Sequence, residues 1–303
     1  MGIRFVTARL FCETLPELGD VSSKTLLSLG VQDCYFSYPQ IRAFLRRHNV
    51  RDDRVASEDV ELTSGFQWVR AEDAEAYRHC IHQRTFFAAL GFSPRNVTAL
   101  DVNDYEGAEI VHDLNVPVPD TLRGRYDVIF DSGTLHYVFS VKDALFNLCR
   151  MCKVGGVVVN FNPVDFSDLG FIGLSAELFR DFYEANGFDK VTLKYIAVPL
   201  HRRAVDRYYL ELSPDSFDYS PLPGYAMSVY SVYRKVSERD LTVPLQGFYR
   251  RLHQTGPAAT APSGHRLRRL ASRTLRDAIH AYRLPSFLFG AIRTRLSAKK
   301  VRL

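Results

Sequence analysis

Short apolar runs alternate along the chain with longer stretches of helical period. The apolar or β-branched runs lie at residues 24–29, 96–101, 108–113, 126–131 and 157–161. Runs of this length, bounded by turn residues, are typical of strands that are buried on both faces of a parallel sheet. Apolar residues with helical spacing lie at residues 38–47, 76–90 and 140–152 and again after Ser175. The alternation predicts an α/β fold in which a mostly parallel, doubly wound sheet carries helices on both faces.

Capping residues mark the expected ends of these helices. Ser37 precedes the stretch at 38–47 and Ser175 precedes the last helix, and serine side chains satisfy free N–H groups at helix starts. Gly91 follows the stretch at 76–90, where glycine commonly ends a helix. We therefore expect helices to begin after both serines and one to stop at Gly91.

The later part of the chain has a different pattern. Two strand-like segments at 191–198 and 227–235 are separated by a long connection, which predicts an antiparallel hairpin at the end of the sheet. Residues 48–75 are charged and weakly periodic, as in an insertion or connector. We expect one α/β domain over residues 1–240, a linker over 241–264 and a basic amphipathic tail over 265–303.

Composition fits a soluble globular protein. The chain has 303 residues, of which 46% are hydrophobic and 24% charged. Its five cysteines are odd in number and scattered, so we expect no disulfide framework and a reducing, cytoplasmic compartment. No uninterrupted apolar run reaches the ~18 residues of a membrane span, and Arg4 and Arg9 make the first residues unlike a signal peptide.

Basic charge is concentrated in the tail. Residues 250–303 hold thirteen Lys and Arg against one acid, a net charge of +12, so the rest of the chain carries −7 against the total of +5. A helix candidate at 265–282 places Leu267, Leu270 and Leu275 on an apolar strip among arginines. Three interpretations stay open: a solvated or partner-docked tail, peripheral contact with the anionic inner face of a membrane, and nucleic-acid binding. Nucleic acid is the least expected, because regularly interleaved aromatic residues are missing.

Three successive predicted strands end in an acid, at Asp101, Asp113 and Asp131. Ligands of parallel α/β sheets bind outside the carboxyl ends of the strands. An acid after the second strand can accept both hydroxyls of a ribose, and an acid after the third can accept an adenine amino group. Each acid alone is equally explained as the start of a turn or a cap. The three together predict nucleoside binding.

Two segments carry a family resemblance. Residues 126–139 (YDVIFDSGTLHYVF) and 150–159 (RMCKVGGVVV) resemble the fourth-strand and post-helix signature of class I S-adenosylmethionine-dependent methyltransferases. The resemblance extends upstream through 100–108 (LDVNDYEGA) and 111–115 (VHDLN), and the Asp-Tyr-Glu-Gly-Ala run is similar to a bacterial branch of methyltransferase-like proteins. It covers roughly residues 24–236 and is strongest over 97–160. It implies a Rossmann-like fold and S-adenosyl-L-methionine as cofactor.

The resemblance also implies which residues contact that cofactor. They are Gly30, Gln32, Asp101, Asp113, Leu114, Asp131 and Gly133. In the family the first strand ends in a glycine-rich loop, because a side chain would block the approach of the cofactor to the backbone. Here the loop reads Leu-Gly-Val-Gln-Asp over residues 29–33, with one glycine, so we expect a degenerate, remodelled loop.

Candidate catalytic residues follow the fourth strand. His136 is the first candidate for a general base, with Asp131 orienting it or the acceptor. The family pattern usually reads Leu-Glu-His where this chain has Leu-His-Tyr, so Tyr137 occupies the usual histidine position. A buried histidine with a satisfied hydrogen bond and a packing tyrosine are the structural alternatives. Asn160 and Asn162, after the fifth strand, suit either a substrate contact or a turn.

No metal site is expected. Cys149 and Cys152 have the spacing of a redox or metal motif but lack a second pair, so we interpret them as packing residues. His79 and His82 share a face of the expected helix at 76–90 and lack a third ligand. The resemblance therefore leads to methyl transfer onto a small molecule, sugar or glycan precursor as the expected function. A non-catalytic methyltransferase-like scaffold, recruited to a membrane surface by its tail, is the alternative.

Overall fold

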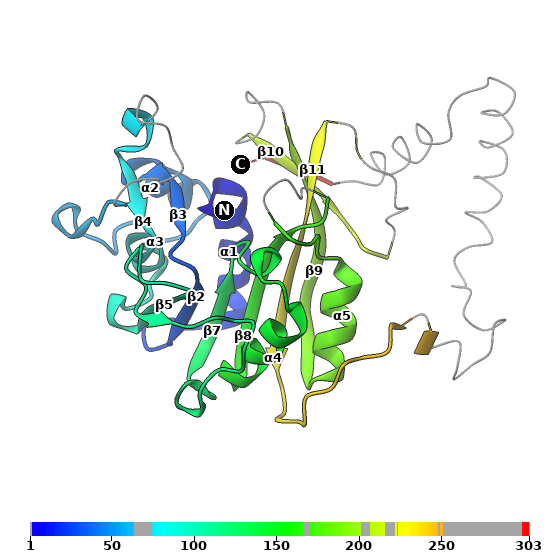
Figure 1. Cartoon of the computed structure of the whole chain (residues 1–303). Helices are drawn as coiled ribbons and strands as arrows, with labels where there is room; N and C mark the ends of the chain where they lie inside the picture. The colour runs from blue at the N-terminus through cyan, green and yellow to red at the C-terminus, as the bar shows by residue number, and fades with distance from the viewer. Residues whose placement is uncertain are drawn as a thin grey trace, which may run out of the picture.

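The main feature of the structure is a nine-stranded sheet with helices on both faces (Figure 1). The computed structural model describes residues 2–63, 74–165, 170–200, 207–215, 222, 224–247, 249–250 and 299–302. The sheet has the order β12-β10-β9-β11-β8-β7-β2-β5-β6. Its strands are β2 (Leu26–Leu29), β5 (Val97–Asp101), β6 (Ile110–Val111), β7 (Tyr126–Asp131), β8 (Cys152–Pro163), β9 (Phe188–Pro199), β10 (Tyr208–Leu212), β11 (Tyr225–Lys235) and β12 (Lys299–Arg302).

Five neighbouring strands are parallel. β2 pairs in parallel with β5 and β7, β5 with β6, and β7 with β8. In chain order these strands stand 3-2-1-4-5 across the sheet, which is the Rossmann arrangement with its reversal of strand order between β2 and β7. β11 then pairs antiparallel with both β8 and β9. The predicted Rossmann-like α/β sheet is confirmed.

Helices cover both faces of this sheet. They are α1 (Phe5–Leu18), α2 (Tyr38–Arg47), α3 (Gln83–Leu90), α4 (Val141–Met151) and α5 (Ala176–Ala185), with 3-10 turns at Ser57–Asp59, Ala74–Tyr77, Pro94–Asn96, Asp120–Leu122 and Leu135–Tyr137. One apolar cluster joins α1, α2 and α3 to one face, and a second joins α4 and α5 to the other. Burial of these two faces is the main term that stabilises the fold.

The predicted helix starts after both serines are confirmed. The backbone N–H of Ser37 donates to Gln40 Oε1 at 2.7 Å, within a capping box that starts α2. Ser175 Oγ accepts from the backbone N–H of Leu178 at 3.2 Å and starts α5. Gly91 ends α3 in the left-handed conformation, as expected.

A second, three-stranded sheet takes one strand from before β2 and two strands from the segment between β2 and β5. It contains β1 (Gly2–Ile3), β3 (Asp33–Ser37) and β4 (Cys80–His82) in the order β1-β3-β4. The predicted helix at 76–90 is wrong in its first half, because β4 pairs antiparallel with β3 and α3 begins only at Gln83. The expected shared face of His79 and His82 is therefore wrong: His82 caps α3, accepting at Nδ1 from the N–H of Arg84.

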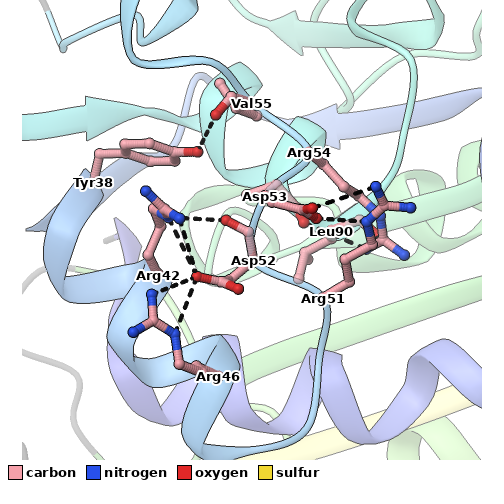
Figure 2. Close-up of polar contacts among 10 residues, drawn as sticks. Tyr38, Arg42, Arg46, Arg51, Asp52, Asp53, Arg54, Val55 and Leu90 are labelled. Carbon is pink, nitrogen blue, oxygen red and sulfur yellow. Dashed lines mark hydrogen bonds and ion pairs between the residues drawn. The ribbon is translucent and has the colours of Figure 1, made fainter.

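Part of the 48–75 insertion is fixed to α2 and α3 by polar contacts (Figure 2). Asp52 accepts from Arg46 Nη2 at 2.8 Å and its backbone carbonyl accepts from Arg42 Nε at 2.9 Å. Tyr38 donates to the carbonyl of Val55 at 2.5 Å, and Arg54 Nη1 donates to that of Leu90 at 2.9 Å. These side chains are engaged with the protein itself, so the cluster anchors the insertion.

The last described residues belong to the main sheet. Residues 299–302, which the sequence assigned to the tail, form β12 and pair antiparallel with β10. The predicted helix at 265–282 and most of the linker at 241–264 lie outside the described residues. Among the helices that the structure describes, none is long and apolar enough to cross a membrane.

Candidate functional site

A cavity of about 340 Å³ opens at the carboxyl ends of β2, β5, β6 and β7. This is the place where the strand order reverses and where ligands of open α/β sheets bind. Six of the seven predicted cofactor residues line it: Gly30, Gln32, Asp101, Asp113, Leu114 and Gly133. Sequence and structure therefore indicate the same edge of the sheet, and the cavity has the size of a small-ligand site.

Gly30 lines the cavity directly after the end of β2. Its φ of +76° is a conformation that favours glycine, and its N–H donates to the carbonyl of Leu100 at 2.7 Å. A Cβ on this residue would lie 3.3 Å from Thr134 Oγ1 and 3.5 Å from Asp101 Oδ2. The single glycine of the loop is thus required both by backbone conformation and by close packing.

The rest of the loop is fixed by side chains. Gln32 Nε2 donates to the carbonyl of Leu29 at 2.5 Å and to Thr134 Oγ1 at 3.3 Å. The N–H of Gln32 donates at 3.0 Å to Gln83 Oε1, which also accepts from Ser28 Oγ at 2.8 Å. Gln32 Oε1 is buried and has no hydrogen-bond partner among the residues that the structure describes. It is an acceptor in the cavity wall that a ligand with an N–H or O–H group could satisfy.

The cavity lining is acidic. Its fifteen residues include Asp101, Glu106 and Asp113 and contain neither Lys nor Arg. Burial raises the pKa of Glu106, and the nearby carboxylates of Asp33 and Asp101 raise it further. Hydrogen bonds from Asn115 lower the pKa of Asp113, which holds the turn after β6. The electrostatic potential of the cavity therefore favours a cationic ligand.

Asp131 does not line the cavity. The carboxylate is fully buried, where Oδ1 accepts from the N–H of Thr134 at 2.8 Å and Oδ2 accepts from Asn162 Nδ2 at 2.5 Å. Burial raises the pKa of Asp131 to about 6, against the opposing effect of these hydrogen bonds. Asp131 supports the turn from Thr134 to Tyr137, in place of the cofactor contact that the sequence suggested.

The two other catalytic candidates differ in access. His136 is 2% exposed, does not line the cavity, and burial lowers its pKa to about 4. Its Nδ1 lacks a hydrogen-bond partner within the described part of the chain. Tyr137 is 37% exposed and lines the cavity, with its ring 3.9 Å from the His136 ring. Of the three predicted catalytic residues, Tyr137 alone faces the cavity.

Among the residues of the site that sequence reasoning missed, Glu106 and Gln83 differ in the signal that the sequence gave. Glu106 lies in the Asp-Tyr-Glu-Gly-Ala run that carried the family resemblance, so its place beside the ribose candidate Asp101 could have been inferred. Gln83 gave no local signal, because it contacts the loop from 51 residues away in the chain.

The interpretation of the cysteines as packing residues agrees with the structure. Cys149 and Cys152 are buried free thiols, and burial raises the pKa of Cys152 to about 12. No group of three His, Cys, Asp or Glu side chains suitable for a metal occurs within the described ranges.

Comparison with known proteins gives structural likenesses at low identity. No family model matches the chain, and no characterised protein matches it in sequence. A S-adenosylmethionine-dependent methyltransferase from Aquifex aeolicus is 14% identical, with 73% of this chain and 87% of that chain covered and a TM-score of 0.33. A branched-chain polyamine synthase from Thermus thermophilus is 14% identical, with 78% of this chain and 57% of that chain covered and a TM-score of 0.38. A variant of a 16S rRNA adenine methyltransferase from Catenulisporales acidiphilia is 14% identical, with 75% of this chain and 94% of that chain covered and a TM-score of 0.33. Likenesses at this level assign no activity to the chain.

Proposed function

We propose that the protein transfers a methyl group from S-adenosyl-L-methionine to a small-molecule, sugar or glycan-precursor acceptor. The observation that carries the proposal is the acidic cavity at the reversal point of the sheet, which holds Asp101 beside Gly30. A cationic nucleoside fits such a lining, because carboxylates can accept ribose hydroxyls and stabilise a positive charge.

The chemistry of the lining residues fits this cofactor. Asp101 follows the second strand and offers the acceptor for a ribose, and Leu114 and Val138 supply an apolar wall for a planar base. The unpaired Gln32 Oε1 suits an ammonium group. In place of the usual glycines, hydrogen bonds of Gln32 to Gln83 and to the carbonyl of Leu29 fix the loop beside the cavity.

Methyl transfer needs alignment more than acid-base chemistry. S-Adenosylmethionine, when bound, supplies the methyl group on a cationic sulfonium. The residues of the chain then have to hold the acceptor in line and exclude water. Tyr137 is the cavity-facing candidate for this task, since burial raises the pKa of its hydroxyl and keeps it protonated as a donor. His136 is neutral near pH 7, and its ring centre lies 3.9 Å from that of Tyr137 with the planes tilted by 39°. Because His136 does not line the cavity, its role is to position Tyr137 and not to contact the acceptor.

Titration with S-adenosylhomocysteine tests the proposal. A ligand that binds only the folded state raises the melting temperature by mass action. We expect a saturable rise for the natural protein and an affinity at least about tenfold lower in Asp101→Asn, because one charged hydrogen bond contributes about 1.5–3 kcal/mol. Glu58→Gln, an exposed acid of the 48–75 insertion, is the matched control and should bind like the natural protein. A folded protein that shows no shift at about 1 mM ligand would exclude this cofactor.

A further inference from the structure

The first helix of the chain begins beside the loop that follows β7. Gly2 and Ile3 of β1 pair in parallel with Asp33 and Cys34 of β3. The carbonyl of Gly2 accepts from Ser132 Oγ at 3.5 Å, directly after the end of β7. Both contacts place the start of α1 at the carboxyl edge of the sheet, next to the candidate site (Figure 1).

The start of α1 is electropositive. The helix has 14 residues, and its N-cap is Arg4, which offers no side-chain acceptor to the free N–H groups. The first turn contains no acidic residue. Unsatisfied N–H groups and the helix dipole together make such a terminus favourable for an anion.

Arg4 adds a second positive group at this position. Its guanidinium carbon lies 4.5 Å from the centre of the Tyr35 ring, and it is half-buried. Among the described residues it forms no ion pair. The acid on the same face of β3, Asp33, accepts at 3.3 Å from Thr63 Oγ1. The charge of Arg4 is thus oriented by an aromatic ring, and within the described ranges no carboxylate pairs with it.

Thr7 supplies an independent indication of a ligand. It lies in the first turn of α1, is 0% exposed, and its Oγ1 has no hydrogen-bond partner in the described part of the chain. Helix side chains tilt toward the N-terminus, and Thr7 follows Arg4 by three residues, so the two side chains lie on the same side of the first turn. A buried hydroxyl without a partner costs free energy, and an anion bound there would remove that cost.

From this geometry we propose that Arg4, the first turn of α1 and Thr7 form a subsite for a carboxylate or phosphate group of the acceptor. The role as an acceptor subsite rests on the proposed methyl transfer. Arg4 and Thr7 lie outside the lining of the acidic cavity, so the subsite belongs to a second ligand and not to the cofactor. The substrate class is accordingly an anionic acceptor, whose charge is opposite to that of the sulfonium.

Inorganic phosphate is the probe for this subsite in the full chain. The melting temperature is measured in increasing sodium phosphate and in sodium chloride of equal ionic strength. We expect a saturable rise in phosphate alone, and an apparent affinity at least about tenfold lower in Arg4→Gln, which removes the charge-assisted contact. Arg95→Gln is the matched control, because Arg95 is exposed and lies in the 3-10 turn before β5, at the opposite edge of the sheet.

Thr7→Val separates binding from folding. It replaces the unpaired hydroxyl with a methyl group, so stability in chloride should be unchanged or higher while phosphate affinity falls severalfold. The proposal is wrong if phosphate acts like chloride on the natural protein, if Arg4→Gln and Arg95→Gln weaken phosphate equally, or if Thr7→Val leaves phosphate affinity unchanged.

S-Adenosylhomocysteine titration of the same variants identifies the source of the anion. Unchanged affinity in Arg4→Gln supports an acceptor subsite. A loss as large as the loss of phosphate binding would assign the subsite to the cofactor and overturn the acceptor role. If S-adenosylhomocysteine binds none of the proteins while phosphate still requires Arg4, the proposed function fails and the anion site stands.

Discussion

The side chain of Gln83 accepts a 3.0 Å hydrogen bond from the backbone N–H of Gln32, which precedes it by 51 residues. The same oxygen accepts from Ser28 Oγ in β2. The first residue of α3 therefore closes the turn that follows the first strand of the main sheet. In this protein the segment between β2 and β5 does more than connect two strands, because it holds one wall of the acidic cavity.

Removing this contact should weaken both the fold and the cavity. Gln83→Leu leaves the buried N–H of Gln32 without its acceptor, whereas Ser28 Oγ can still donate to the carbonyl of Gly30 at 2.9 Å. One such unsatisfied donor costs about 1–3 kcal/mol, so we expect urea unfolding to show a loss of about that size and S-adenosylhomocysteine to bind more weakly. Gln40→Ala at the start of α2 is the control. It should cost no more than about 1 kcal/mol and leave ligand binding unchanged.

Gly30 should be intolerant of any side chain. Alanine there has to adopt a φ of +76°, and its Cβ would lie 3.2–3.5 Å from Gln32, Thr134 and Asp101. Gly124→Ala is a matched control, since Gly124 has a φ of +56° but open space around its Cβ. Both changes should cost about 1–2 kcal/mol of backbone strain in thermal unfolding. The additional loss of ligand affinity should occur only in Gly30→Ala, and equal affinities in the two variants would contradict the position of Gly30 in the site.

Local sequence predicts the strand ends of the site well. Asp101 and Asp131 each follow an apolar run, and the run itself fixes where the strand stops, so both positions could be read before the structure. The role of each acid depends on tertiary contacts with residues that are distant in the sequence. Asp101 lines the cavity, whereas Asp131 turns inward to the N–H of Thr134 and to Asn162, which lies 31 residues away.

Two elements could not be predicted because neighbours decide them. Cys80 and Ile81 continue the helical spacing of α3, yet they form β4, because pairing with β3 satisfies their backbone and buries them. α1 buries polar residues such as Thr7 and Thr14 and keeps only a narrow polar face at Arg9, Glu13 and Glu17, so its amphipathic pattern is weak in the sequence.

Asp131 should make stability depend on pH in a direction opposite to that of most carboxylates. Burial raises its pKa from 3.8 to about 6, so the folded state retains the proton to a higher pH than the unfolded state. The contribution of Asp131 to stability therefore falls as the pH rises from about 4 to about 6, and this loss persists above pH 6. The lowered pKa of His136 acts in the opposite direction over the same range, so the comparison is made with a variant of Asp131 alone. Asp131→Asn lacks this titration, and rotation of the Asn162 amide would let its unpaired Oδ1 accept from the new amide. Relative to the natural protein, the variant should gain about 1–3 kcal/mol in unfolding free energy between pH 4 and pH 7. A constant difference across that range would contradict the buried, raised pKa.

Glu106 should distinguish a charged cofactor from its neutral product. Its carboxylate lies in the cavity lining, where it stabilises a sulfonium but has little effect on a thioether. In Glu106→Gln, S-adenosylmethionine should bind about three- to tenfold more weakly, while S-adenosylhomocysteine changes less. Calorimetric titration of each ligand into the natural protein and into Glu106→Gln measures the loss of affinity for each ligand. Parallel losses for the two ligands would mean that the acidic lining does not recognise the sulfonium.

β12 should protect the free edge of the main sheet. Val301 pairs with Tyr209 and packs against the core, and Lys300 Nζ lies 3.9 Å from the Tyr208 ring. An aspartate at Val301 would have to bury its charge or detach the strand, which leaves the N–H and C=O groups of β10 unpaired. We expect Val301→Asp to lower the unfolding free energy by about 1–2 kcal/mol and to increase concentration-dependent aggregation. Val243→Asp introduces the same charge at a residue that is 64% exposed, and should change stability by less than about 0.5 kcal/mol. Equal effects of the two substitutions would show that β12 adds nothing to the stability of the sheet, whereas the expected difference would make residues 299–302 part of the folded domain.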